Sequence, residues 1–328
     1  MDWMSGLWLG QPVWMWLVFA VSVLSLLAFD LGVLGKKRGG DGTIGVRQSL
    51  GLSAFYIAAA SVFGGWVWMT LGPQSGMEYF TGFALEKALA LDNVFVISVI
   101  FGALAIPRQY QHRVLFWGII GVLVLRALMI GLGAALVTQF DWVMWFFAAF
   151  LIFTGIKMLR GGDDDHTPDP DNHPLIKALG RYMPITPRLH GDKFMVNLPD
   201  AAGKVKRHAT PLLVALIMVE AADLVFAVDS IPAIFAITKD PFIVYTSNIF
   251  AVLGLRALFF ALEALIHRFE ALKTALSAVL VFIGGKIIYA QFFGKVDAGI
   301  SLGVTLGLLL GGVLYSLWKT RGEEKKAA

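Results

Sequence analysis

Long, nearly continuous runs of apolar residues dominate this chain, and short polar stretches separate them. A helix needs about 20 apolar residues to cross the hydrocarbon core of a bilayer. Nine runs approach this length, which predicts an all-α membrane protein with about nine transmembrane helices. The runs do not alternate between polar and apolar positions, so they do not indicate a membrane β-barrel. The predicted spans are 13–34, 48–71, 78–105, 113–137, 141–160, 210–236, 242–266, 271–291 and 298–318.

Composition supports the same class. The chain is 57% hydrophobic and only 15% charged, with a mean hydropathy of +0.72, whereas soluble domains are about a quarter charged. It contains no cysteine, which excludes disulfides, thiolate metal sites and thiol redox chemistry by this chain. The net charge of +4 does not indicate a nucleic-acid partner, because the basic residues lie in short loops between apolar runs.

Lysine and arginine are distributed unevenly between the two sets of loops. Twenty lie in the loops and tail on one side of the predicted spans, and two, Lys239 and Lys295, lie on the other. Because cytoplasmic loops are enriched in basic residues, this places the N-terminus outside and the C-terminus in the cytoplasm. We expect a multi-pass protein of the bacterial inner (plasma) membrane, with the lipid bilayer as its first partner.

A series of charged residues occurs twice within the apolar sequence. The string Leu-Arg-Ala-Leu at 125–128 recurs at 255–258, and Phe-x-Gly-x-Lys at 153–157 recurs at 282–286. Spans 3–5 carry the first copy and spans 6–8 the second, so equivalent helices run in opposite directions. This predicts an inverted-topology repeat, an architecture of many secondary transporters. The copies are Glu86, Asp92, Arg126 and Lys157, and Asp223, Asp229, Arg256 and Lys286.

These patterns divide the chain into five parts. We predict an N-terminal two-helix segment at 1–76, repeats at 77–160 and 210–292, a cytoplasmic loop at 161–209, and a last helix with a basic tail at 293–328. The loop begins with an acidic run, is rich in proline, and has strand-like sequence between 193 and 206 that predicts a hairpin. It is too small for a catalytic domain, so we do not expect an enzyme, and it is the segment available to protein partners.

Two pairs of oxygen ligands occupy matching positions near the predicted midplane. Asp92 and Asn93 lie in span 3, and Asp229 and Ser230 lie in span 6. Pro232 follows three residues after Asp229, which predicts a kink that frees a backbone carbonyl. Ionisable residues inside a membrane mark ion pathways in many proteins. The predicted metal-ligating residues are Asp30, Glu86, Asp92, Asn93, Asp223, Asp229 and Ser230.

A second interpretation is that each acid neutralises a nearby base. The candidate charge partners are Arg126, Arg256, Lys157 and Lys286. The planar guanidinium groups of the two arginines suit paired hydrogen bonds to carboxylates. Lys157, near a span end, can instead extend to the membrane surface. Glu220, which has no acidic counterpart in the first copy, is a further candidate proton carrier or ligand.

The six histidines all lie in loops or at span ends, so the membrane interior offers oxygen ligands only. Oxygen sites favour magnesium, calcium or manganese over zinc or copper. We therefore expect a transported divalent cation and no covalently bound cofactor.

Several strings resemble the TerC/Alx family of membrane proteins over roughly residues 13–320. They lie at 29–34, 86–95, 190–194, 223–235 and 245–258. The resemblance implies that the acidic motifs at Asp30, Glu86, Asp92, Asp223 and Asp229 are functional, and it links the chain to manganese export, tellurite resistance and alkaline-responsive expression. Members often carry another acid near the start of the span 3 motif, where this chain has Gly82, Phe83 and Ala84.

The leading hypothesis is a divalent cation transporter that exports manganese by alternating access of the two repeats. One alternative is a membrane-bound redox modulator or tellurite-resistance protein, as the resemblance implies. Without cysteine it would act indirectly, for example through metal supply. Another alternative is a factor that assists the assembly of other membrane proteins.

Overall fold

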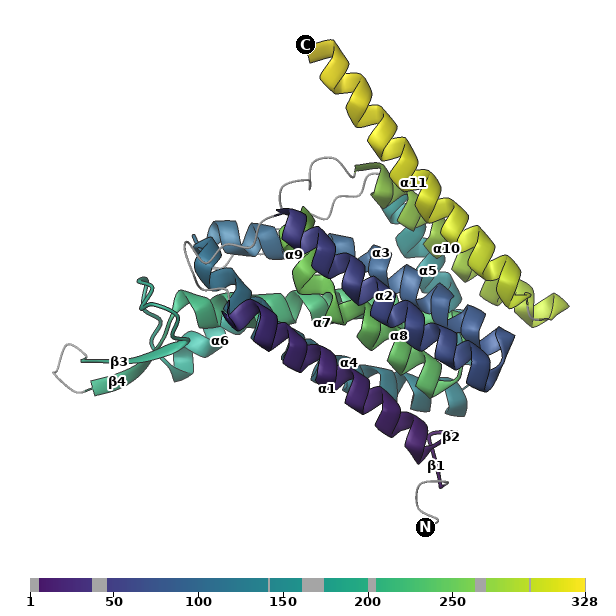
Figure 1. Cartoon of the computed structure of the whole chain (residues 1–328), viewed down its shortest axis with the longest axis horizontal. Helices are drawn as coiled ribbons and strands as arrows, with labels where there is room; N and C mark the ends of the chain where they lie inside the picture. The colour runs from purple at the N-terminus through teal and green to yellow at the C-terminus, as the bar shows by residue number, and fades with distance from the viewer. Residues whose placement is uncertain are drawn as a thin grey trace.

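The computed structural model describes residues 6–36, 46–140, 142–160, 174–199, 205–262, 270–294 and 296–327. This part of the chain is almost entirely helical and contains two small hairpins (Figure 1). The helices are α1 Val13–Lys36, α2 Val46–Leu71, α3 Pro73–Ala103, α4 Arg108–Gln139, α5 Trp142–Leu159, α6 Pro174–Tyr182, α7 Pro211–Ile237, α8 Pro241–Leu253, α9 Leu255–Leu262, α10 Glu270–Phe293 and α11 Ala298–Ala327. The strands are β1 Leu7–Trp8, β2 Gln11–Pro12, β3 Met195–Pro199 and β4 Val205–Ala209.

The all-α membrane class is confirmed, whereas the count of nine crossings stays a prediction. Six described helices, α1, α2, α4, α5, α10 and α11, are long and apolar enough to cross a membrane, and α7 is a seventh if its two bent halves form one span. Helix α3 is long enough but carries four charged residues within 31. The predicted span 242–266 is not one helix, because it is divided at Gly254 into α8 and α9.

Proline and aspartate fix where several helices begin. Pro73, Pro211 and Pro241 open α3, α7 and α8, where a missing backbone N–H costs nothing. The Asp240 carboxylate accepts a hydrogen bond of 2.8 Å from the Phe242 backbone N–H and so caps α8. Inside α7, the halves Pro211–Ala227 and Ser230–Ile237 meet at 41°, the bend that Pro232 predicts.

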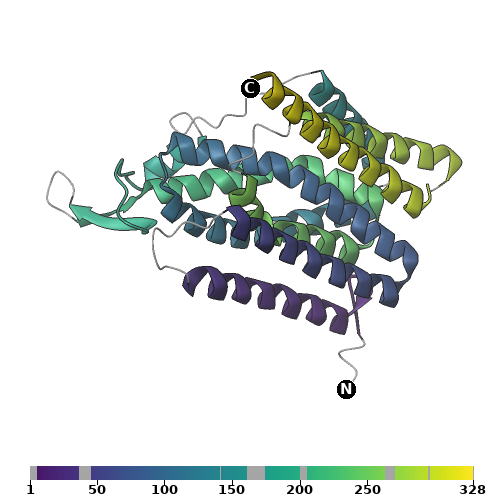
Figure 2. The same ribbon diagram turned by 45° about the horizontal axis from the view of Figure 1, so that its top comes forward.

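The helices pack in a reciprocal pattern. Helix α3 packs on α8 and α7 packs on α4, while α3 also contacts α7 and α5 contacts α10 (Figures 1 and 2). The α5–α10 contact shows the reciprocity in detail. A Cβ on Gly155 would lie 2.8 Å from the Ser277 carbonyl oxygen, and a Cβ on Gly284 would lie 2.9 Å from the Ala148 carbonyl oxygen. Gly155 and Gly284 are equivalent positions of the two motif copies, and so are Ala148 and Ser277. A local two-fold axis would exchange the two contacts in this way.

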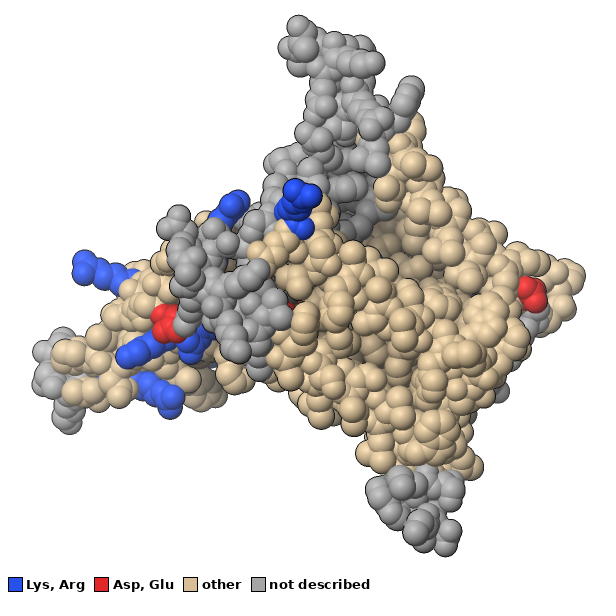
Figure 3. Space-filling model, in the orientation of Figure 1, with Lys and Arg blue, Asp and Glu red and all other residues tan. Residues whose placement is uncertain are grey.

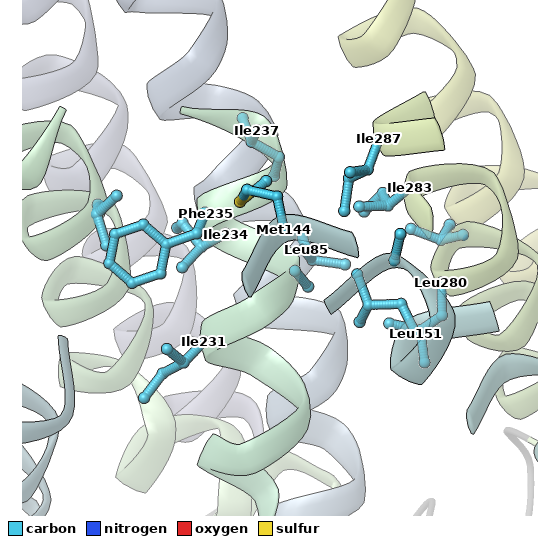
Figure 4. Close-up of a cluster of buried hydrophobic side chains, with 14 of the residues drawn as sticks. Leu85, Met144, Leu151, Ile231, Ile234, Phe235, Ile237, Leu280, Ile283 and Ile287 are labelled. Atoms are coloured by element: carbon cyan, nitrogen blue, oxygen red, sulfur yellow. The ribbon is translucent and has the colours of Figure 1, made fainter. Parts of the chain in front are cut away.

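An apolar cluster fills the space between α3, α5, α7 and α10. Figure 4 shows Leu85, Met144, Phe235 and Ile287 converging from these four helices. The cluster members are fully or almost fully buried, and they hold α5 and α10 against the second half of α7. This cluster lies between two polar regions of the molecule, which are described below.

The outer surface is apolar over the middle of the bundle and charged at one end. Exposed apolar side chains such as Leu24, Val62, Leu132 and Phe153 cover α1, α2, α4 and α5, as expected for surfaces that face lipid. On the face drawn in Figure 3, most of the visible lysine and arginine side chains lie at the end of the molecule that carries α6 and the β3–β4 hairpin. The tan middle of this face shows none. The predicted hairpin is confirmed as antiparallel β3–β4, whereas α6 was not predicted.

Candidate functional site

Arg126 of α4 is buried at the centre of the bundle and binds acidic and amide side chains from three other helices. It donates two hydrogen bonds to Asp223 of α7, from Nε to Oδ2 at 3.2 Å and from Nη2 to Oδ1 at 2.9 Å. Its Nη1 donates to Glu86 Oε1 of α3 and to Asn248 Oδ1 of α8, the latter at 2.9 Å. Only 2% of Arg126 is exposed, so these contacts are shielded from solvent.

We call Glu86, Asn93, Arg126, Asp223 and Asn248 the Arg126 cluster. It contains two carboxylates and one guanidinium, so ionised carboxylates would leave one negative charge uncompensated among these five side chains. A charge inside a membrane is costly unless it is paired. The cluster therefore favours an additional positive species, either a proton or a cation.

A small cavity of about 30 Å³ lies next to the cluster, with Asn93 and Asp223 on its polar side. Asn93 Nδ2 donates to Asp223 Oδ1 at 3.1 Å, while Asn93 Oδ1 is buried and has no hydrogen-bond partner. One water molecule needs roughly 10–15 Å³, so this cavity can hold a single water or a dehydrated ion. The remaining wall is apolar, from residues such as Ile97, Val122 and Val219.

Glu220 adds a third carboxyl group near the cavity. It lies one turn before Asp223 on α7, and both of its side-chain oxygens are buried without a hydrogen-bond partner. The carboxyl group faces Gly121 of α4, where a Cβ would collide with it, and Gly118 lies one turn away. The sequence analysis named Glu220 only as a further candidate proton carrier or ligand, outside the main ligand set. Its i−3 spacing from Asp223 and the glycine pair in α4 were additional signals.

The structure brings together only some of the predicted site residues. Glu86, Asn93, Asp223 and Arg126 meet in the cluster, and the buried Ser230 hydroxyl lies near Glu86 without normal hydrogen-bond geometry. The backbones of Asp92, Asp229 and Arg256 belong to α3, α7 and α9, but their side chains lie outside the described residues. Their predicted roles therefore stay predictions.

The remaining predicted residues lie on other elements. Asp30, one of the predicted ligands, is buried on α1. Lys157 is exposed near the end of α5. Lys286 of α10 donates to Ser301 Oγ at 2.9 Å, so this lysine lines a second cavity near α11.

No group of three or more histidine, aspartate or glutamate side chains capable of holding a metal ion is present among the described residues. The ligands that this part of the chain offers are carboxylate and amide oxygens in pairs.

Lys87, the neighbour of Glu86, stabilises the break between α8 and α9. Its Nζ donates to the Ala251 carbonyl at 3.1 Å, and a Cβ at Gly254 would lie 2.8 Å from the same nitrogen. The last carbonyls of a helix lack intrahelical partners and carry partial negative charge, so an ammonium group there is favourable. Glycine at position 254 leaves the space that this ammonium occupies.

Substitution of Lys87 by methionine should lower the free energy of unfolding by about 1–3 kcal/mol, because the Ala251 carbonyl loses its donor inside the protein. The exposed Lys239 provides a matched control, since a surface Lys239→Met change should stay within about 0.5 kcal/mol of the parent. Unfolding of the purified protein in detergent measures both. Equal free energies of unfolding for the two variants would show that Lys87 does not stabilise the break between α8 and α9.

Comparison with known proteins gives consistent matches. Residues 71–324 match the family described as "Integral membrane protein TerC family". A membrane protein of Myxococcus xanthus is 46% identical over 308 residues, which cover 94% of this chain and 93% of that protein. A membrane protein of Rickettsia bellii is 47% identical over 302 residues, covering 92% and 96%. The protein named "Putative membrane-bound redox modulator Alx" of Salmonella typhi is 39% identical over 325 residues, covering 97% and 98%. No solved structure matches this chain.

Proposed function

Because this chain belongs to the TerC family of integral membrane proteins, we propose that it transports divalent metal cations, with manganese export as its main activity. The observation that carries the proposal is the surplus of buried oxygen acceptors around the Arg126 cluster. Asn93 Oδ1 and both Glu220 oxygens have no donor, and two carboxylates share one guanidinium. Oxygen donors of this kind select hard cations such as manganese, magnesium and calcium.

The cation would bind where Asn93 and Asp223 border the small cavity. In the absence of cargo, Arg126 binds both Glu86 and Asp223 and compensates one of their two negative charges. An arriving divalent cation competes with the guanidinium for the Asp223 carboxylate and takes the free Asn93 oxygen as a further ligand. Departure of the cation returns Asp223 to Arg126, so no carboxylate is left unpaired at either stage.

Orientation and setting belong to the same proposal. The uneven loop charge supports an N-terminus outside and a C-terminus in the cytoplasm of the bacterial inner membrane. Export then moves the cation from the end that carries the β3–β4 hairpin toward the opposite end. The 161–209 loop is available to protein partners at the cytoplasmic face, and the transport cycle needs neither an enzymatic step nor a resident cofactor.

Flux into proteoliposomes tests the proposal, with manganese, calcium, magnesium and zinc compared. Asn93→Ala and Asp223→Asn should each lower manganese flux at least about ten-fold, since an ion-ligand contact contributes more than the 1.4 kcal/mol of one decade. Asp92→Ala and Asp229→Ala are expected to do the same. Asn197→Ala, at an exposed position of β3, is the matched control and should retain parental flux. Undiminished flux in both Asn93→Ala and Asp223→Asn would refute the proposal.

The redox-modulator name of some relatives makes a different prediction. With no cysteine in the chain, a direct redox role needs a bound redox cofactor. Purified protein that carries a chromophore responsive to reductant would favour that alternative over metal transport.

A further inference from the structure

A second cavity, here called the vestibule, opens at the end of the bundle opposite the β3–β4 hairpin. It measures about 450 Å³ and lies where α3 and α11 begin and α7 ends. Its walls carry polar and charged side chains from distant parts of the sequence, including Glu78, Thr81, Asp240, Lys286 and Ser301. Polar groups at membrane depth are tolerated where they line a water-filled space, so the vestibule is an aqueous recess in the protein.

The floor of the vestibule is apolar. Met144, Phe235, Ile237 and Ile287 line it, and all four belong to the apolar cluster of Figure 4. The same cluster includes Leu85, which directly precedes Glu86 of the Arg126 cluster. The apolar cluster therefore separates an aqueous recess from the charged centre.

This barrier is thin along α3. Thr81 lines the vestibule, and Glu86 follows five residues later, which corresponds to about 7.5 Å along a helix at 1.5 Å per residue. Leu85 occupies the step between them and is 1% exposed.

The part of α7 beyond its bend contributes most of the barrier. Ile231, Ile234, Phe235 and Ile237 all lie in the half Ser230–Ile237, beyond the 41° bend. Pro232 in this half lacks the N–H that would tie it to the preceding turn. The bend therefore lacks one of the backbone hydrogen bonds that join successive turns of a helix.

Glycines form the surfaces on which this segment rests. A Cβ on Gly133 of α4 would lie 2.7 Å from Phe235 Cε2, and a Cβ on Gly82 of α3 would lie 2.8 Å from Ile234 Cδ1. The two large side chains therefore occupy the space that a Cβ at each glycine would fill. The glycines allow this segment to pack directly against the backbones of α4 and α3.

We propose that the vestibule is the outer mouth of the ion path and that the α7 segment Ser230–Ile237 is its gate. The structure is the outward-closed state, in which the apolar cluster excludes water from the Arg126 cluster, as apolar constrictions do in channels. Movement of the segment about the bend opens a route for a hydrated divalent cation between the charged centre and the vestibule. This inference rests on the proposed transport function for its cargo.

The absence of native cysteine makes an accessibility test direct. Ser75→Cys reports on the vestibule and Leu85→Cys on the barrier, and each is treated in membrane vesicles with a charged, membrane-impermeant thiol reagent. Cys at position 75 should react from the face opposite the hairpin, because Ser75 lines the vestibule and is partly exposed. Cys at position 85 should stay protected in the parent.

Removal of the gate side chain should expose the barrier. In Leu85→Cys combined with Phe235→Ala, the reaction rate at position 85 should rise at least about ten-fold, because the apolar constriction becomes wet. Two controls should remain protected. One is Leu85→Cys with Phe101→Ala, which removes a buried phenylalanine from another cluster, and the other is Leu212→Cys with Phe235→Ala.

An unreactive cysteine at position 75, or reaction only from the hairpin face, overturns the assignment of the vestibule. An unchanged rate at position 85 in the Phe235→Ala background overturns the gate. These readouts use no metal, so they separate from the transport proposal. If labelling is enhanced but the parent shows no divalent flux, the gate is supported and the proposed cargo is refuted. If the parent shows flux but labelling is not enhanced, the transport proposal is supported and the gate is refuted.

Discussion

Replacement of Arg126 by alanine should lower the free energy of unfolding by about 3–5 kcal/mol, the usual cost of removing one partner from a buried ion pair. The loss arises because Glu86 and Asp223 remain inside the bundle without a counter-charge, and Asn248 loses a donor. Denaturation of the purified protein in detergent, followed by circular dichroism, measures the change. Reduced accumulation in the membrane is expected in cells.

Two comparisons make this result specific to the buried pairing. Arg113 forms an ion pair with Asp192 in which the two side chains are 35% and 41% exposed, so Arg113→Ala should cost less than about 1 kcal/mol. Combining Arg126→Met with Glu86→Gln and Asp223→Asn removes both stranded charges and should recover much of the loss. If Arg126→Ala matched Arg113→Ala in stability, the cluster would not be a buried ion-pair network.

Alanine at Gly155 or Gly284 should destabilise the protein by similar amounts, about 1–3 kcal/mol each, which is typical of overpacking. The added methyl groups would press on backbone carbonyls, those of Ser277 and Ala148, and backbone cannot rotate away as a side chain can. Helices α5 and α10 must then separate. The same unfolding measurement in detergent compares the variants.

Gly285, adjacent to Gly284, provides the control. Nothing lies within 4 Å of a Cβ built there, so Gly285→Ala should be neutral or slightly stabilising because alanine favours helix. Equal losses at positions 155 and 284 follow from the reciprocal contact between the motif copies. A large loss at one position and none at the other would contradict the local two-fold relation.

The reciprocal packing also clarifies the charged centre. Glu86 and Asp223 occupy equivalent positions in the two motif copies, and both bind the single guanidinium of Arg126. One side chain near a two-fold axis can serve two equivalent partners. Asn93 and its counterpart Ser230 both keep an unpartnered side-chain oxygen, and Glu220 keeps two.

Features that depend on interactions between residues near one another along the chain could be predicted from the sequence. Long apolar runs predicted membrane-spanning helices, the strand-like sequence between 193 and 206 predicted the β3–β4 hairpin, and Pro232 predicted the bend in α7. Glu86 and Asn93 are seven residues apart, which places them on one face of α3, and both belong to the Arg126 cluster. Each of these follows from helix or strand geometry over a few turns.

Which side chains contact one another across helices could be seen only in the folded protein. The partners of Arg126 lie 40, 97 and 122 residues away, and a local pattern could not choose Glu86, Asp223 and Asn248 over the other polar residues in the spans. The same holds for the break at Gly254, which depends on Lys87 from another helix, and for the vestibule, whose walls come from six helices. Pairing, cavities and barriers depend on how helices pack against one another, and packing joins residues that no periodicity along the chain relates.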